Sequence, residues 1–356
     1  MPMVWSELHR RHEPGGEVWV GVRTPGTEVP ERAERIRTEI VAAGATVIEA
    51  DPHPDDALLA IHDADLLDYL ASAWSDWREA GLDVDPGQDR VVPYIFPHPG
   101  MLPSGPAAIP TAVTARAGRY AYDTMTLVGP GSWEAARAAA DVALTAADLV
   151  LGGEPAAYAC CRPPGHHATR SAFGGSCYLN NTAAAAARLR DARESSDGPV
   201  AIIDIDAHHG NGTQSIFYED PRVLSASVHV NPGAGWFPHF LGFGTETGGD
   251  GAPGTNRNVS LEPATGDGPW LEAISGLAGW AAGQGAGALV VALGVDAAEA
   301  DSESPLRVTA SGYREAGRIL GRLGLPTVVV QEGGYDLESI GMLVRQTLVG
   351  LEQGLG

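Results

Sequence analysis

Short apolar runs alternate with longer helical patterns from residue 132 onward, and this alternation constrains the fold more than any other feature of the chain. Strands are expected at residues 156–161, 200–206, 223–230, 288–295 and 326–331. Helices are expected at residues 132–147, 181–193, 269–284 and 311–323. Apolar strands alternating with helices indicate a mainly parallel sheet covered on both faces. The sequence therefore predicts an α/β fold with three layers, α/β/α.

The first third of the chain is less regular. An apolar run at 18–22 is followed by an expected helix at 30–43, a strand at 45–50 and a helix at 62–77. Prolines and glycines then crowd the chain, so we expect a long loop at about 91–121, and long loops in compact domains are usually functional. Because no break in composition divides the 356 residues, we expect one domain over residues 1–356.

Charge and cysteine content exclude several classes of protein. The 23 basic residues are all arginine and face 45 acidic residues, so the net charge of −22 argues against a nucleic-acid partner. An acidic surface would attract cationic substrates. Solubility, adaptation to high salt or a GC-rich genome that favours arginine is an alternative explanation of the charged residues. Three cysteines are too few for a disulfide framework. Residues 1–16 are too polar for a signal peptide and no apolar run would span a bilayer, so we expect a cytoplasmic protein without a membrane partner.

Metal-binding and acid–base side chains follow four of the predicted strands. In parallel α/β sheets ligands bind beyond the carboxyl ends of the strands, which makes these positions site candidates. They are Arg162-Pro163-Pro164-Gly165-His166-His167, Asp204-Ile205-Asp206-Ala207-His208, Gly294-Val295-Asp296 and Glu332-Gly333-Gly334-Tyr335. A polar loop can end any single strand, but four such ends favour a catalytic site.

The residue types indicate how such a site would work. Asp206, His208 and Asp296 supply the three ligands of a catalytic zinc, which leaves one position open for water. The adjacent His166 and His167 offer a general base for that water and a proton for the leaving group.

Three further residues would support this chemistry. Asp204 and Asn211 are available to orient the two imidazoles. Tyr335 can donate a hydrogen bond to a developing oxyanion, worth about 3 to 4 kcal/mol. Gly333 and Gly334 permit a close approach to it.

These motifs, together with Cys177-Tyr178-Leu179-Asn180-Asn181 and Ser227-Val228-His229, resemble the zinc-dependent histone deacetylase superfamily from about His12 to the end of the chain. The likeness is strongest to bacterial acetylpolyamine amidohydrolases and class II deacetylase-like enzymes. It implies an arginase/deacetylase-type fold with Asp206, His208 and Asp296 as zinc ligands. It makes His167 the principal general acid/base, faced by Asn211, and pairs His166 with Asp204. Tyr335 would stabilise the tetrahedral intermediate.

The resemblance implies further features. A structural potassium would be bound by main-chain oxygens of Asp204, Asp206, His208 and Val228 with the side chains of Asp204 and Ser227. Phe237 and Gly175 would line the substrate tunnel, and the protein would be a homodimer. The chain departs from the family at Ser176, where an aromatic tunnel wall is common. Residues 91–121 also contain no Asp or Glu, which weakens the case for a polyamine substrate but not for deacylation.

The sequence thus predicts a zinc-dependent amidohydrolase acting on an N-acyl amide: an acetylpolyamine, an acetyl-lysine peptide or an acylated small metabolite. A two-metal ureohydrolase of the arginase type is an alternative, but it needs a second aspartate where Ala298 stands. A catalytically silent acetyl-binding protein of the same fold is the other alternative.

Overall fold

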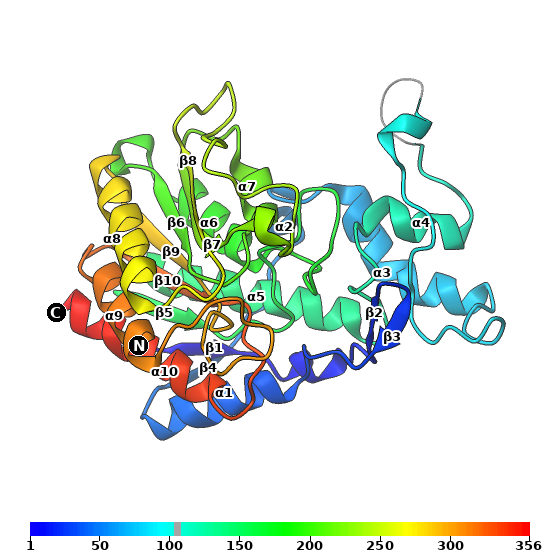
Figure 1. Cartoon of the computed structure of the whole chain (residues 1–356), viewed down its shortest axis with the longest axis horizontal. Helices are drawn as coiled ribbons and strands as arrows, with labels where there is room; N and C mark the ends of the chain where they lie inside the picture. Colours follow the sequence, from blue (N-terminus) through cyan, green and yellow to red (C-terminus); the bar gives the residue numbers. More distant parts are fainter. Residues whose placement is uncertain (103–107) are drawn as a thin grey trace.

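A central sheet of eight parallel strands forms the core of the computed structural model, which describes residues 1–102 and 108–356 (Figure 1). The strand order is β4-β1-β5-β10-β9-β6-β7-β8. The strands are β1 (Met3–Trp5), β4 (Val47–Glu49), β5 (Ala156–Ala159), β6 (Val200–Asp204), β7 (Val223–Val230), β8 (Asn256–Leu261), β9 (Ala288–Leu293) and β10 (Thr327–Gln331). A separate antiparallel hairpin pairs β2 (Glu17–Trp19) with β3 (Val22–Thr24).

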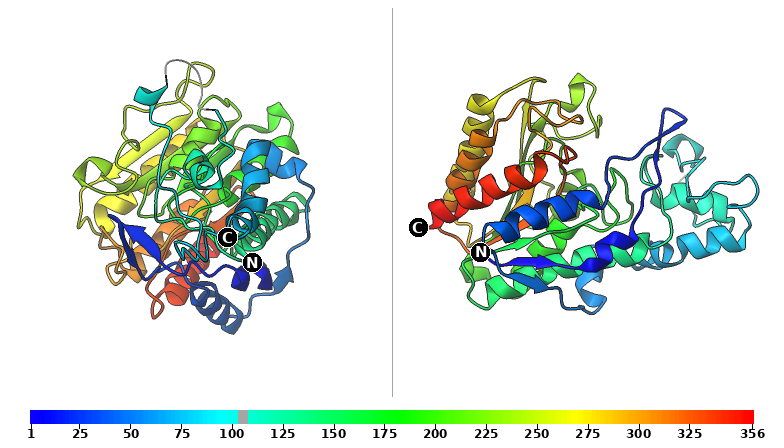
Figure 2. Two further views of the ribbon diagram at one scale, coloured as in Figure 1. Left: turned by 90° about the vertical axis from the view of Figure 1, so that its right-hand side faces the viewer. Right: turned by 90° about the horizontal axis from the view of Figure 1, so that it is seen from below.

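Helices cover both faces of the sheet, as Figure 2 shows from two sides. One face carries α1 (Glu31–Ala42), α8 (Asp267–Gly283), α9 (Ala310–Gly321) and α10 (Ile340–Leu355). The other carries α2 (Asp56–Leu59), α5 (Ser132–Leu151), α6 (Asn181–Asp191) and α7 (Asn211–Phe217). Beyond the sheet, α3 (Ala64–Glu79) packs with α4 (Val113–Tyr120). Short 3₁₀ turns are η1 (Glu7–Arg11), η2 (Pro99–Met101), η3 (Ser195–Asp197) and η4 (Pro232–Ala234). The predicted three-layer α/β/α fold is confirmed.

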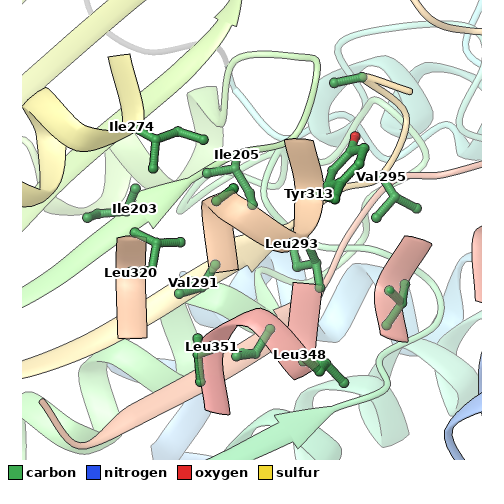
Figure 3. Packing of buried hydrophobic residues seen from close by; sticks show 14 of the residues in the cluster. Ile203, Ile205, Ile274, Val291, Leu293, Val295, Tyr313, Leu320, Leu348 and Leu351 are labelled. Carbon is green, nitrogen blue, oxygen red and sulfur yellow. The ribbon is translucent and has the colours of Figure 1, made fainter. Parts of the chain in front are cut away.

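Strand β6 illustrates why the central strands are apolar along their whole length. Successive side chains of a strand point to opposite faces. Ile203 and Ile205 therefore pack under α8 and α9, while Val200 and Ile202 pack on the side of α5 and α6. Figure 3 shows Ile203 and Ile205 beside Ile274 and Leu320 on the first of these faces. Burial on both faces removes the polar alternation of a half-exposed strand.

The predicted helices and the five predicted late strands are found with small shifts at their ends. The sequence did not predict β1, β8 and α10. The apolar run at 18–22 spans the end of β2, the turn and the start of β3 in the β2–β3 hairpin. The prediction of a loop at 91–121 is wrong for its last part, because Val113–Tyr120 forms the helix α4. Tyr120 of that helix is buried and stacks on Tyr69 of α3 at 4.5 Å, so tertiary packing stabilises it. Residues 103–107 of the predicted loop lie outside the described residues.

The described part of the chain contains no helix that is both long enough and apolar enough to span a bilayer.

Candidate active site

Four neighbouring strands in the middle of the sheet, β5-β10-β9-β6, deliver the residues that follow their carboxyl ends to one place. Gly165 to His167 follow β5, while Asp204 ends β6 and Asp206 and His208 follow it. Asp296 follows β9 and Tyr335 follows β10. The four strand ends identified in the sequence are therefore consecutive in space, although the chain separates them.

Asp206, His208 and Asp296 converge on one point, with their potential ligand atoms all within 4.8 Å of one another. Nδ1 of His208 lies 3.0 Å from Oδ2 of Asp296 and 3.4 Å from Oδ1 of Asp206. Both carboxylates are fully buried, whereas His208 is partly exposed toward the cavity described below. This is the geometry expected of three ligands that share one ion and leave an open side.

The electrostatics of this cluster suit a divalent cation. Burial, followed by the charge of Asp206, raises the pKa of Asp296 to about 7. Two buried carboxylates side by side are unfavourable unless a positive charge compensates them. Space is limited as well, because a Cβ on Gly333 would lie 2.6 Å from an oxygen of each aspartate. The residues present therefore fit one metal ion held by two carboxylates and one imidazole.

The side chain of Asn211 orients His167. Its Nδ1 lies 2.7 Å from Oδ1 of Asn211, and because an amide oxygen only accepts, we assign the Nδ1–H tautomer. Nε2 then carries the free lone pair. Burial, and next the neighbouring His166, holds the pKa of His167 well below its usual range. His167 is therefore a neutral base.

His166 has the opposite electrostatics. Its Nδ1 lies 2.8 Å from Oδ2 of Asp204. Burial lowers its pKa, but the charges of Asp206 and Asp204 outweigh that effect and raise the pKa of His166 well above its usual range. The two imidazoles lie 4.0 Å apart, so the charge held on His166 keeps His167 neutral.

Glu332 lies near the imidazole of His166 and Cys177, but it holds backbone rather than a second metal. Its carboxylate accepts hydrogen bonds from the backbone N–H groups of Gly165 and His166 and from the hydroxyl of Thr182. This use of the carboxylate anchors the turn that carries both histidines. The Asp206, His208 and Asp296 cluster, in contrast, opens onto the cavity described below through His208.

Tyr335 borders the cavity and keeps its proton. Burial raises the pKa of Tyr335 well above 10.0, although the guanidinium of Arg32, 4.7 Å from the ring centre, acts in the opposite direction. Arg32 is buried and also donates hydrogen bonds to the carbonyl oxygens of Glu332 and Gly334. The backbone N–H of Tyr335 is bound by Asp301 at 2.6 Å. The loop that presents the tyrosine hydroxyl is thus held from two sides.

A cavity of about 440 Å³, called here the catalytic cavity, opens onto these groups. Its lining includes His167, His208 and Tyr335, together with Gly175 and Phe237, the two residues predicted to line the substrate tunnel. Gly333 and Gly334, also predicted to contact substrate, are not among the described residues that line this cavity. The N–H of Gly333 donates to Asp206 at 2.9 Å, and the carbonyl of Gly334 accepts from Arg32.

Sequence reasoning missed two acidic residues of the same cavity, Glu17 and Glu303. Glu17 begins the β2–β3 hairpin, and Glu303 lies in the loop between β9 and α9. Burial, and next the charge of Glu303, raises the pKa of Glu17 to about 7. Neither residue belongs to a motif or follows a strand end directly, so only the folded arrangement reveals them.

The residues of the predicted potassium site also lie side by side. Asp204 and Ser227 are paired in the register of β6 and β7, and Val228 follows in the buried part of β7. The hydroxyl of Ser227 is 2.8 Å from Nδ1 of His229.

Comparison with known proteins agrees with this arrangement. The sequence pattern of the histone deacetylase domain matches residues 26–351. The chain is 39% identical over 352 residues to an acetylpolyamine amidohydrolase of Mycoplana ramosa, covering 99% of both proteins. It is 38% identical over 355 residues to acetylpolyamine amidohydrolase 1 of Pseudomonas aeruginosa, again with 99% of both chains covered. The crystal structure of an acetylpolyamine aminohydrolase from Burkholderia pseudomallei superposes with a TM-score of 0.93 at 35% identity, over 99% of each chain. This protein belongs to the histone deacetylase domain family.

Proposed function

We propose that this protein is a metal-dependent deacetylase whose substrates are acylated amines carrying a second, positively charged nitrogen, as acetylpolyamines do. The main support is the presence of two acidic residues, Glu17 and Glu303, in the catalytic cavity. They share its lining with His167, His208 and Tyr335. Relatives named acetylpolyamine amidohydrolases, matched over 99% of the chain, support the same substrate class. Residues 91–121 contain no Asp or Glu, which weakened the case for a polyamine substrate. In the folded chain the acidic groups at the cavity come instead from the β2–β3 hairpin and from the loop between β9 and α9.

Asp206, His208 and Asp296 would hold one zinc ion, the metal general to this family. Bound there, zinc supplies a Lewis acid that polarises the amide carbonyl and makes a water acidic enough to act as nucleophile near neutral pH. A two-metal ureohydrolase, the first alternative, does not fit the family to which the chain belongs.

The side chains of this chain perform the proton transfers. Nε2 of His167 takes a proton from the attacking water, whose oxygen forms a bond to the carbonyl carbon. The hydroxyl of Tyr335 donates a hydrogen bond to the oxygen that becomes negative. The C–N bond then breaks as His167 returns the proton to the leaving nitrogen, giving a carboxylic acid and an amine. His166, held charged by Asp206 and Asp204, stabilises the negative charge that develops during the reaction.

Electrostatics select the substrate. The pKa of Glu17 is raised because burial and the nearby charge of Glu303 disfavour its ionised form. An ammonium group between the two carboxylates would relieve this repulsion and bind with both. A neutral substrate of the same length would not compensate the two carboxylates. We therefore expect the positive charge of the substrate to lower KM and to have little effect on kcat.

A substrate panel with charge variants tests this proposal. We expect Glu303→Gln and Glu17→Gln each to raise KM for an acetylated diamine about tenfold, as loss of one partly buried charge pair of ~1.4 kcal/mol would. KM for a neutral N-acetylalkylamine should stay unchanged. Glu154→Gln, which removes the same charge from an exposed loop, is the control. Equal KM changes for charged and neutral amides would refute cation recognition, and no turnover of any acyl amide with zinc bound would favour the catalytically silent alternative.

Several features from the sequence remain part of the proposal. Asp204, Ser227 and Val228, with main-chain oxygens nearby, would bind a structural potassium. A homodimer is supported by exposed apolar side chains among the described residues: Tyr94 and Met101, and Val20 and Phe240 at a neighbouring cavity. The net charge of −22 supports the absence of a nucleic-acid partner. A cytoplasmic location stays a prediction from composition.

A further inference from the structure

Residues 122–126, which follow α4, contact several walls of the catalytic cavity at once, and they are called here the 122–126 clamp. The sequence motifs of the site do not include this segment, and it carries no group that reaches the reacting atoms. Met125 of the clamp lines the cavity directly. The other residues of the clamp form hydrogen bonds with residues that line the cavity or lie next to its lining.

Asp123 and Thr126 hold the turn of Gly175 and Ser176. Oδ2 of Asp123 accepts the N–H of Gly175 at 2.6 Å, and the hydroxyl of Thr126 accepts the N–H of Ser176 at 2.8 Å. The same hydroxyl donates to Oδ2 of Asp123 at 3.2 Å, which joins the two contacts. Oδ1 of Asp123 accepts the N–H groups of Met125 and Thr126, so the clamp is rigid in itself.

The turn that is held needs such support. Gly175 has φ +58° and Ser176 has φ +62°, and a non-glycine residue persists in this left-handed region only where its surroundings enforce it. A Cβ on Gly175 would lie 2.4 Å from Cδ2 of His167. The turn therefore packs directly on the imidazole of the base, and a small displacement would change the width of the cavity beside it.

The clamp reaches two more walls. The hydroxyl of Tyr122 donates to the carbonyl of His167 at 2.9 Å, and its ring stacks on Phe237 with centroids 6.3 Å apart. Thr124 donates to the carbonyl of Val18 at 2.7 Å and accepts the N–H of Val18 at 3.2 Å. Val18 is the hairpin residue next to Glu17. One five-residue segment thus fixes the positions of the base, the aromatic wall and the acidic hairpin relative to one another.

We propose that Asp123 and Thr126 are positioning residues that set the width of the catalytic cavity at the scissile amide, by holding the Gly175–Ser176 turn against His167. The intact clamp favours acylated amines with an unbranched chain next to the amide nitrogen. Loss of the clamp lets the turn move and admits a branched chain. The choice of substrates rests on the proposed function, whereas the geometry of the turn does not.

The test is the selectivity between two substrates, an acetylated linear diamine and its analogue with a methyl branch next to the amide nitrogen. The ratio of their kcat/KM values cancels the fraction of active protein, so a merely destabilised variant leaves it unchanged. We expect Thr126→Val, which keeps the shape and removes the hydroxyl, to lower the linear-to-branched ratio about tenfold, the range seen for one misplaced methylene. Thr126→Ser keeps the hydroxyl and should stay within about twofold of the wild type.

Asp123→Asn is the second variant, because its amide would turn donor hydrogens toward the N–H of Gly175 or of Thr126. It should move the ratio in the same direction as Thr126→Val. A ratio that stays at the wild-type value in either folded variant would overturn the proposal.

A binding readout separates this inference from the proposed function. Linear and branched hydroxamates of the same two chains are titrated into the zinc-loaded proteins, and the ratio of their Kd values is compared. If the wild type hydrolyses neither amide, the proposed function fails, while the hydroxamate ratio still decides the role of the clamp. An equal ratio in wild type, Thr126→Ser and Thr126→Val would refute it.

Discussion

Tyr335 carries a hydroxyl that faces the catalytic cavity and stays protonated, because burial raises its pKa well above 10.0. Replacing it with phenylalanine removes the donor while the ring can keep its contact with Arg32. We expect Tyr335→Phe to lower kcat about 10²- to 10³-fold, the usual loss for one oxyanion donor, with a much smaller change in KM. Steady-state kinetics on an acetylated diamine measure this.

The exposed Tyr94 offers the matched control, since Tyr94→Phe makes the same chemical change on the protein surface. It should leave kcat unchanged. Affinity for a hydroxamate should remain near the wild-type value in Tyr335→Phe if the metal site is intact. A kcat within about threefold of the wild type would show that another group stabilises the oxyanion.

Individual residues differ in how far the sequence could predict them. Asp206, His208 and Asp296 were predictable because each follows an apolar strand, and parallel strands bring their carboxyl ends to one edge. Glu17 and Glu303 were not, because a hairpin and a long loop place them and no local pattern specifies where those segments lie. The roles of the predicted residues are proposals, and Tyr335→Phe tests one of them.

At the scale of elements, His53 fastens the loop between β4 and α2 onto helix α5. Its two ring nitrogens face Asp141 at 3.3 Å and Asp148 at 3.1 Å. The hydrogen bond to Asp141 raises the pKa of His53 above 6.5, burial opposes this, and the bond to Asp148 adds to it. The folded state therefore binds a proton on His53 more tightly than the unfolded chain does.

The sign of the pH dependence follows from that shift. A raised pKa in the folded state contributes stability that is complete below pH 6.5 and is lost as the pH rises through the folded-state pKa. We expect the wild type to exceed His53→Gln in free energy of unfolding most at about pH 6, with the difference shrinking toward about pH 9. Urea unfolding at several pH values measures it. The free energy of unfolding of His98→Gln, a change at an exposed loop position, should stay parallel to that of the wild type over the same pH range.

Among the elements, burial decided what the sequence could predict. Strands β6, β9 and β10 were found because each is an uninterrupted apolar run buried on both faces. Strand β1 has three residues in a polar context and is held mainly by its neighbours β4 and β5. Helix α10 was missed because glycines interrupt its pattern. Gly350 is required there by packing, since a Cβ would lie 1.9 Å from the carbonyl oxygen of Arg314 in α9.

For the whole molecule, the proposed homodimer predicts a mass about twice 37.0 kDa. Val20 and Phe240, 81% and 87% exposed, lie at an apolar cavity of about 640 Å³ next to the catalytic cavity, a surface whose burial would stabilise a dimer. We expect Phe240→Asp to raise the dissociation constant of the dimer at least about tenfold, measured by sedimentation equilibrium. Leu59→Asp, at an exposed apolar position on α2, is the control. A wild-type chain that sediments as a monomer at micromolar concentration would contradict the proposal.

The four strands β5-β10-β9-β6 that carry the site have a thermodynamic consequence. The proposed metal ligands converge only when β6 and β9 are paired in register, and the N–H of Gly333, just after β10, donates a hydrogen bond to Asp206. No single fragment of the chain contains a preformed pocket for the ion. A bound metal would thus be a ligand of the native state alone, and its binding free energy would add to the stability of the entire sheet. Metal binding would in this way couple catalytic activity to folding, and the free energy of unfolding would rise with the concentration of free metal.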